Sequence, residues 1–145
     1  MTIATAQLEV RIKLVEEHLR AENEHNVSNI MATFGNHPKF GLNGLTLDRA
    51  DAIRGLYEGF GFGNQGGFSE IRVEVTGRHI AAESVVLELL LSGKHTAEWQ
   101  GIPATHKTFS VPACAIFTFD ADDKLAAETV YFDGTILLRE FGVLA

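Results

Sequence analysis

The sequence predicts an α+β fold in which helices fill the first half of the chain and an antiparallel sheet fills the second. Two features of the chain predict it. Apolar residues recur mainly at helical spacing up to about residue 60, whereas from Phe68 onward they alternate with polar residues as in strands. Helices followed by long strands joined through turns are typical of segregated α and β parts, not of a parallel sheet with interleaved helices.

Three helices are predicted before the sheet. The first covers residues 6–25, where apolar side chains recur every three or four positions and charged ones occupy the other faces. Asn26 is suited to cap a second helix over residues 27–34, and Asp48 to cap a third over residues 49–60. The apolar stripe of the third helix is continuous, so we expect one side of it to be buried.

Strands are predicted on both sides of the third helix. The pair Asn43-Gly44 favours a tight hairpin turn, so the alternating residues around it predict two short strands. The alternation in the second half predicts four long strands, at about residues 68–81, 85–99, 107–120 and 124–132. Asp133 is then suited to cap a closing helix over residues 134–141.

Length and composition limit the functional classes. The 145 residues are expected to form a single domain, residues 1–145, that buries roughly 70% of the surface of the unfolded chain. A net charge of −7 argues against a nucleic-acid partner, which would need a basic face. Cys114 is the one cysteine, and neither a signal peptide nor a membrane-spanning run is evident, so we expect a cytoplasmic protein.

Two patterns in the sequence match known binding motifs but lack the context that those motifs need. Residues 61–66 match the dinucleotide pattern G-x-G-x-x-G, but that motif needs a strand before it and a helix after it, and the predicted order here is the reverse. His18, Glu22 and His25 have the spacing of a metal-binding triad on one helix. A helical wheel places them beside the apolar stripe, on a flank expected to be solvated, so no metal or cofactor is predicted.

The segment from Ser92 to Asp133 contains several short patterns in a fixed order. They are G-x-H-T-x-x-W-x-G-I-P-x-T, V-P-x-x-x-I-F-x-F, D-D-K-L and Y-F-D. Together with the helices before them, these patterns resemble the SnoaL-like polyketide cyclases, also called ester cyclases, of the nuclear-transport-factor-2-like superfamily, which includes ketosteroid isomerase. The resemblance covers nearly the whole chain.

The resemblance adds expectations about shape, ligand and assembly. It implies a strongly curved sheet wrapped around the N-terminal helices, a cystatin-like cone with a pocket between sheet and helices. It also implies a small, apolar, polyketide-like ligand and a homodimer through the open sheet face. Glu88 lies among apolar residues of the strand at 85–91, where an unpaired charge would be costly, so a salt bridge at the sheet edge or a dimer contact is expected for it.

The strand over residues 126–133 carries the main catalytic candidate. Strand alternation places Glu128, Val130 and Phe132 on one face. In the resembled cyclases this strand ends in E-H-W-D, whose last residue is the catalytic base, and the matching position here is Val130, which cannot accept a proton. Glu128, two residues away on the same face, is therefore the candidate general base or acid; the alternative is that it pairs with an arginine of a neighbouring strand.

The other candidates are ligand-binding residues of the expected pocket. Asn23 and Asn26 lie in the apolar stripe of the first helix, where either capping or pocket lining would satisfy their amides. The full set of candidate ligand-binding residues is Asn23, Asn26, Tyr57, His95, Trp99, Cys114, Ile116, Val130 and Phe132. Two functions remain open: a cyclase, isomerase or hydrolase that works by proton transfer without metal or cofactor, and a non-catalytic module for ligand binding or dimerisation.

Overall fold

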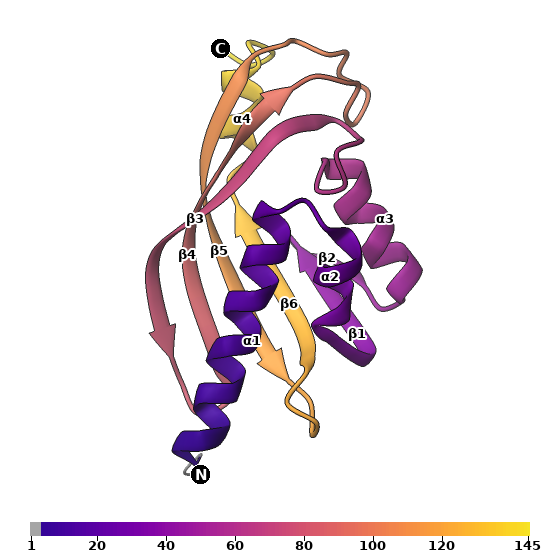
Figure 1. Ribbon diagram of the computed structural model, residues 1–145. Helices are drawn as coiled ribbons and strands as arrows, with labels where there is room; N and C mark the ends of the chain where they lie inside the picture. The colour runs from indigo at the N-terminus through magenta and orange to yellow at the C-terminus, as the bar shows by residue number, and fades with distance from the viewer. Residues whose placement is uncertain (1–3) are drawn as a thin grey trace.

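The computed structural model describes residues 4–145 and is an α+β fold, as predicted (Figure 1). Three helices and a short hairpin precede four long strands, and a short helix closes the chain. The elements are α1 Thr5–Asn23, α2 Val27–Ala32, β1 Phe34–Leu42, β2 Leu45–Leu47, α3 Ala50–Phe60, β3 Phe68–Ile80, β4 Ser84–His95, β5 Thr108–Phe119, β6 Leu125–Phe132 and α4 Gly134–Glu140. Within residues 4–145, none of the helices is long and apolar enough to cross a membrane.

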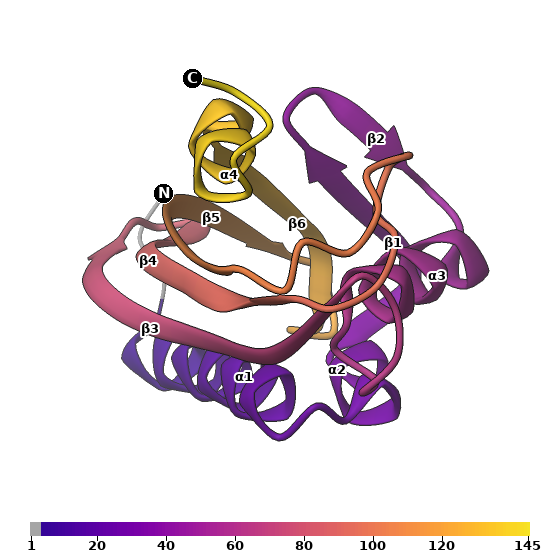
Figure 2. The ribbon, with the colours of Figure 1, turned by 90° about the horizontal axis from the view of Figure 1, so that it is seen from above.

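The strands form one curved, open sheet with the order β2-β1-β6-β5-β4-β3. Neighbouring strands are antiparallel except β1 and β6, which run parallel, a pairing that the sequence did not predict. Figure 1 shows α1 and α2 in front of the strands, and the view in Figure 2 shows the curvature of β3 and β4. The helices α1 and α2 therefore cover one face of the sheet.

Local features explain where the helices and turns fall. The side chain of Asn26 accepts a hydrogen bond of 3.0 Å from the backbone of Asn29, which caps α2 as predicted. Gly61 ends α3 with φ 131°, and a side chain there would collide with the Phe68 carbonyl. The glycine-rich residues 61–66 therefore form the loop that joins α3 to β3, with the helix before and the strand after.

The face of the sheet that points away from the helices is partly apolar. It includes Val86, Leu90 and Ile116, which are half-buried, and Tyr131, which is 50% exposed. Glu88 lies on this face and pairs with His79 at 2.9 Å, with both side chains exposed.

We predict a homodimer through this face, because a partly apolar sheet surface is typical of a symmetric interface. Sedimentation equilibrium at micromolar concentration should give twice the mass of the chain. Tyr131→Lys should shift the population to monomer without changing the circular dichroism spectrum. A monomeric wild-type protein would contradict the prediction.

Candidate active site

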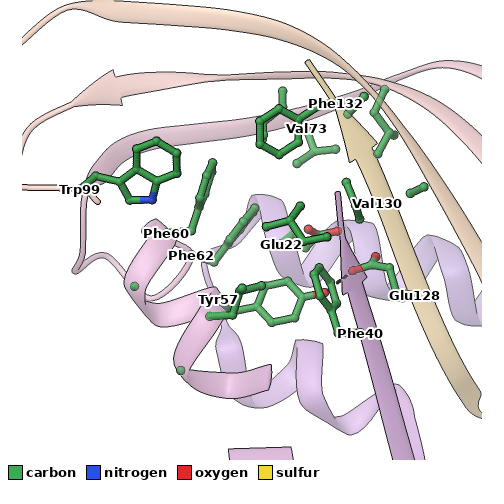
Figure 3. A pocket seen from close by; sticks show the side chains of 18 of the residues that line it. Glu22, Phe40, Tyr57, Phe60, Phe62, Val73, Trp99, Glu128, Val130 and Phe132 are labelled. Atoms are coloured by element: carbon green, nitrogen blue, oxygen red, sulfur yellow. Dashed lines mark hydrogen bonds between the residues drawn. The ribbon is translucent and has the colours of Figure 1, made fainter. Parts of the chain in front are cut away.

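A cavity of about 290 Å³ lies between the helices and the sheet (Figure 3). Its walls are almost entirely apolar and aromatic, and its ionisable groups are the carboxyls of Glu22 and Glu128 and the hydroxyl of Tyr57. The figure shows Trp99 at one end and Glu128 at the other. The lining residues are Glu22, Phe40, Leu42, Gly55, Leu56, Tyr57, Gly59, Phe60, Phe62, Val73, Leu89, Leu91, Trp99, Gln100, Ala113, Ala115, Glu128, Val130 and Phe132.

The polar end of the cavity is a buried network centred on His18. This side chain is 0% exposed, and Glu128, Tyr57 and Glu22 are 3%, 2% and 7% exposed. The Nε2 atom of His18 lies 3.0 Å from a carboxylate oxygen of Glu128 and 3.4 Å from one of Glu22. The other Glu128 oxygen accepts a hydrogen bond from the Tyr57 hydroxyl. Both oxygens of Glu128 are thus bound by protein donors.

The orientation of the His18 ring is set from behind by Thr33. The Thr33 hydroxyl donates to the Ile30 carbonyl at 2.6 Å, so its oxygen is left to accept from His18 Nδ1–H at 2.8 Å. Nδ1 therefore carries a proton and faces Thr33, while the other ring nitrogen, Nε2, faces the two carboxyls. The edges of Phe34 and Phe117 pack against the ring, with centroids 5.7 Å and 5.4 Å away.

The protonation states follow from burial and mutual charge. Burial lowers the pKa of His18, but the carboxylates of Glu128 and Glu22 outweigh it and the net pKa is raised. Burial raises the pKa of Glu22 to about 8, with His18 opposing and Glu128 adding to the rise. Burial and Glu128 also hold the pKa of Tyr57 well above its usual value. The raised pKa favours the charged form of His18, whereas Glu22, with a pKa of about 8, and Tyr57 keep their protons at neutral pH.

The same cluster has donors of the kind that bind a divalent metal. One nitrogen of His18 and one oxygen each of Glu22 and Glu128 lie within 4.8 Å of one another. Metal binding requires a neutral imidazole and ionised carboxylates. At neutral pH a metal would have to displace the protons of His18 and Glu22, so protons compete directly for this position.

Several predicted site residues come together in the cavity. Tyr57 reaches it from α3, Trp99 from the loop after β4, and Val130 and Phe132 from β6, on the same side as Glu128. Glu128 pairs with no arginine of a neighbouring strand; its partners in the described part of the chain are His18 and Tyr57.

The two asparagines are structural and do not line the cavity. Asn23 exchanges two hydrogen bonds with the backbone of Val73, at 2.9 Å and 2.8 Å, and so ties the end of α1 to the edge strand β3. The side chain of Asn26 caps α2. The capping alternative therefore applies to Asn26, and the pocket-lining assignment of both residues is corrected.

The β5 candidates lie on the wrong side of the sheet for ligand contact. Ala113 and Ala115 line the cavity, and because side chains alternate along a strand, Cys114 and Ile116 point to the opposite face. The sequence prediction had placed Cys114 and Ile116, and not their neighbours, on the cavity face of β5. The pairing of Ala115 with Val130 fixes the parity, and the sequence does not reveal that pairing.

His95 is also outside the cavity lining. It is 0% exposed and stacks on Phe141, with ring centroids 4.4 Å apart, and its Nδ1 lies 3.0 Å from the Thr105 hydroxyl. The ring thus packs the end of β4 against the C-terminal segment.

The prediction that His18 and Glu22 lie on a solvated flank of the first helix is wrong. His18 and Glu22 are buried, not on a solvated flank, whereas His25 lies apart and contacts the Ile71 carbonyl at 2.7 Å. The sequence analysis missed the role of His18, Glu22 and Thr33 beside Glu128. The helical spacing of the apolar residues in the later part of α1 could have indicated this, because His18 and Glu22 share their side of the helix. The buried residues there are Leu14, Val15, His18, Leu19, Ala21 and Glu22.

The chain thus combines a curved, open α+β sheet with an apolar cavity that has an ionisable cluster at one end. The chain belongs to the SnoaL-like polyketide cyclase family, whose sequence profile matches residues 63–141. Among curated proteins, none matches the sequence significantly.

Solved structures with the same fold span nearly the whole chain. AclR, a proposed hydroxylase from Streptomyces galilaeus, is 21% identical with a TM-score of 0.82, over 95% of this chain and 99% of that one. A SnoaL-like protein from a Jannaschia species, described as a candidate polyketide cyclase, is 15% identical with a TM-score of 0.82 over 100% of both chains. A protein with a ketosteroid-isomerase-like fold from Catenulispora acidiphila, in complex with trimethylamine, is 17% identical with a TM-score of 0.72, over 91% of this chain and 93% of that one. At these identities the likeness establishes the fold.

Proposed function

We propose that this protein is a cofactor-independent enzyme that transfers protons on a small, apolar, oxygen-bearing molecule, as polyketide cyclases and isomerases do, with Glu128 as the general base. One observation carries the proposal: Glu128 is 3% exposed and its carboxyl lies at the polar end of an apolar cavity. Few contacts there compete with a substrate for its remaining lone pairs.

The surroundings of Glu128 support a role as base. Tyr57 and His18 contact one oxygen each, which fixes the orientation of the Glu128 carboxyl in the cavity wall. The Thr33–His18–Glu128 chain resembles the arrangement by which a third group orients a catalytic pair. Family membership makes a polyketide-like ligand the first class of molecule to test.

The alternative function is a non-catalytic ligand-binding or dimerisation module of the same fold. Val130, at the position of the cyclase base, favours it, because valine cannot take a proton. The two functions differ in what Glu128 does to a bound ketone, so one substitution separates them.

The experiment uses β-tetralone, a neutral bicyclic ketone, as probe. Trp99 is the single tryptophan and lines the cavity, so quenching of its fluorescence reports binding. Exchange of the α-protons in deuterium oxide, followed by nuclear magnetic resonance, reports the base. We expect Glu128→Gln to keep the binding and to slow exchange by roughly a hundredfold to ten-thousandfold, the usual contribution of general acid–base catalysis.

Glu88→Gln is the matched control, because this glutamate is exposed on the opposite face of the sheet. It should exchange at the wild-type rate. Binding with unchanged exchange in Glu128→Gln would refute catalysis by Glu128 and favour the binding module.

A further inference from the structure

Glu22 reaches the cavity from α1, opposite the strand that carries Glu128, and has no part in the proposal above (Figure 3). Its carboxyl receives no hydrogen bond from the residues that the structure describes. His18 Nε2 lies 3.4 Å from one Glu22 oxygen, but it is closer to an oxygen of Glu128, at 3.0 Å, and to the Tyr57 hydroxyl, at 3.2 Å. Glu22 is thus a buried carboxyl that faces the ligand space with its hydrogen-bonding capacity unused.

The cluster holds two carboxyls and one cation. Two carboxylates this close cannot both ionise cheaply in a buried site, because each raises the cost of charge on the other. Glu128 has the imidazolium and the Tyr57 hydroxyl as donors, so it takes the negative charge. Glu22 is left with the proton, in agreement with its raised pKa of about 8. The two carboxyls therefore differ in state although they are adjacent.

We propose that Glu22 is a second catalytic residue, the general acid of the site, and that Glu22 and Glu128 together enolise a neutral ketone bound between them. This inference rests on the proposed function, since it needs Glu128 as the base. The Glu128 carboxylate takes a proton from the carbon next to the carbonyl, and the electron pair of that C–H bond becomes the C=C bond of the enol. The carbonyl oxygen takes the proton of Glu22.

Charge and protons balance in this step. The ketone becomes a neutral enol, Glu128 becomes neutral and Glu22 becomes the carboxylate, so the pair carries one negative charge before and after. Once the Glu128 carboxyl has exchanged its proton with solvent, reversal at the same carbon exchanges the hydrogen of the substrate. In an unsaturated ketone the enol is a dienol, and its protonation by Glu128 at the far carbon isomerises the substrate. Both routes restore Glu22 and Glu128 to their first state, and exchange consumes only a solvent proton.

The geometry also defines the class of substrate. One carboxyl oxygen of Glu22 and one of Glu128 lie within 4.8 Å of each other. The two carboxyls are therefore close enough to reach the oxygen and the adjacent carbon of one carbonyl group. The rest of the cavity, towards Trp99, is apolar. A net negative ligand would meet the charge of Glu128 without a free cation, so the site is suited to neutral ketones.

The test compares Glu22→Gln with Glu16→Gln in the β-tetralone exchange assay. Glu16 is on the same helix with a side chain 58% exposed, which makes it the matched control. We expect Glu22→Gln to bind β-tetralone with unchanged Trp99 quenching and to lose exchange by roughly a hundredfold or more. Wild-type exchange should fall as pH rises through about 8, and this fall should be absent from the residual exchange of Glu22→Gln.

The outcomes separate the two proposals. Wild-type exchange that Glu128→Gln abolishes and Glu22→Gln leaves unchanged would overturn the acid assignment and leave the base in place. Loss of exchange in Glu22→Gln with the alkaline fall retained would also overturn it, because a purely structural role leaves the titrating group intact. Absence of exchange in the wild-type protein would overturn both proposals.

Discussion

Replacing His18 with leucine is expected to destabilise the protein by about 3–5 kcal/mol at neutral pH, because removal of one partner leaves a buried charge unpaired. His18 is 0% exposed and supplies the one cation near Glu128 and Glu22 in the described cluster. Leucine would fill much of the space but would offer no donor to either carboxyl. Urea unfolding should show a lower midpoint with little change in slope.

A second substitution makes the reason for this loss testable. In His18→Leu combined with Glu128→Gln no buried carboxylate needs a cation, so the double variant should be more stable than His18→Leu alone. His37 is exposed on β1, and His37→Leu is the control that should change stability by less than about 0.5 kcal/mol. Additive effects of the two substitutions at 18 and 128 would show that the ion pair is not what stabilises this site.

Most of the fold could be predicted from the sequence because its signals are local. Caps such as Asn26 and turn pairs such as Asn43-Gly44 act within a few residues, and each observed helix begins within a residue of its predicted start. The parallel pairing of β1 with β6 was not predictable in this way. It joins Phe40 to Glu128, two residues that only the folded sheet brings together.

The candidate site was predicted where one strand sufficed. The alternation of β6 alone places Glu128, Val130 and Phe132 on one face, and all of them line the cavity. The parity of β5 depends on its register with β6, which is a property of the pair, and there the sequence prediction was wrong for Cys114 and Ile116.

The burial of His18 and Glu22 could not be predicted from the sequence of α1 alone. A helical wheel ranks faces by their apolar residues, and Glu22 scores as surface. In the structure the cost of burying these groups is reduced by Thr33, Tyr57 and Glu128, which belong to other elements. Polar groups that satisfy one another across elements do not show in the periodicity of any single element.

Replacing Glu22 with glutamine is expected to stabilise the protein while it abolishes the proposed activity. The pKa of Glu22 is about 8 in the folded protein, against 4.5 for the ordinary side chain. Between these values the unfolded chain has released the proton that the folded chain keeps. The contribution of Glu22 to the free energy of unfolding therefore falls as pH rises, by about 1.4 kcal/mol per pH unit, and this fall stops above about pH 8.

His18 contributes in the same direction. Its raised pKa stabilises the folded state fully below the ordinary value of 6.5, and this stabilisation is lost as pH rises through the folded-state pKa. Glutamine at position 22 removes the Glu22 contribution and keeps the part of the His18 contribution that comes from Glu128. The variant should consequently be more stable than the wild type at neutral pH, by about 3 kcal/mol, with a shallower pH dependence.

Urea unfolding midpoints measured from about pH 5 to about pH 9 test this directly, and the gap between Glu22→Gln and wild type should widen up to about pH 8 and then stay constant. Glu16→Gln, exposed on the same helix, should follow the wild-type curve. Parallel curves for Glu22→Gln and wild type would mean that Glu22 is already ionised in the folded protein and could not serve as an acid. A difference in midpoint that widens with pH, together with loss of exchange, would mean that Glu22 destabilises the fold but is needed for the reaction.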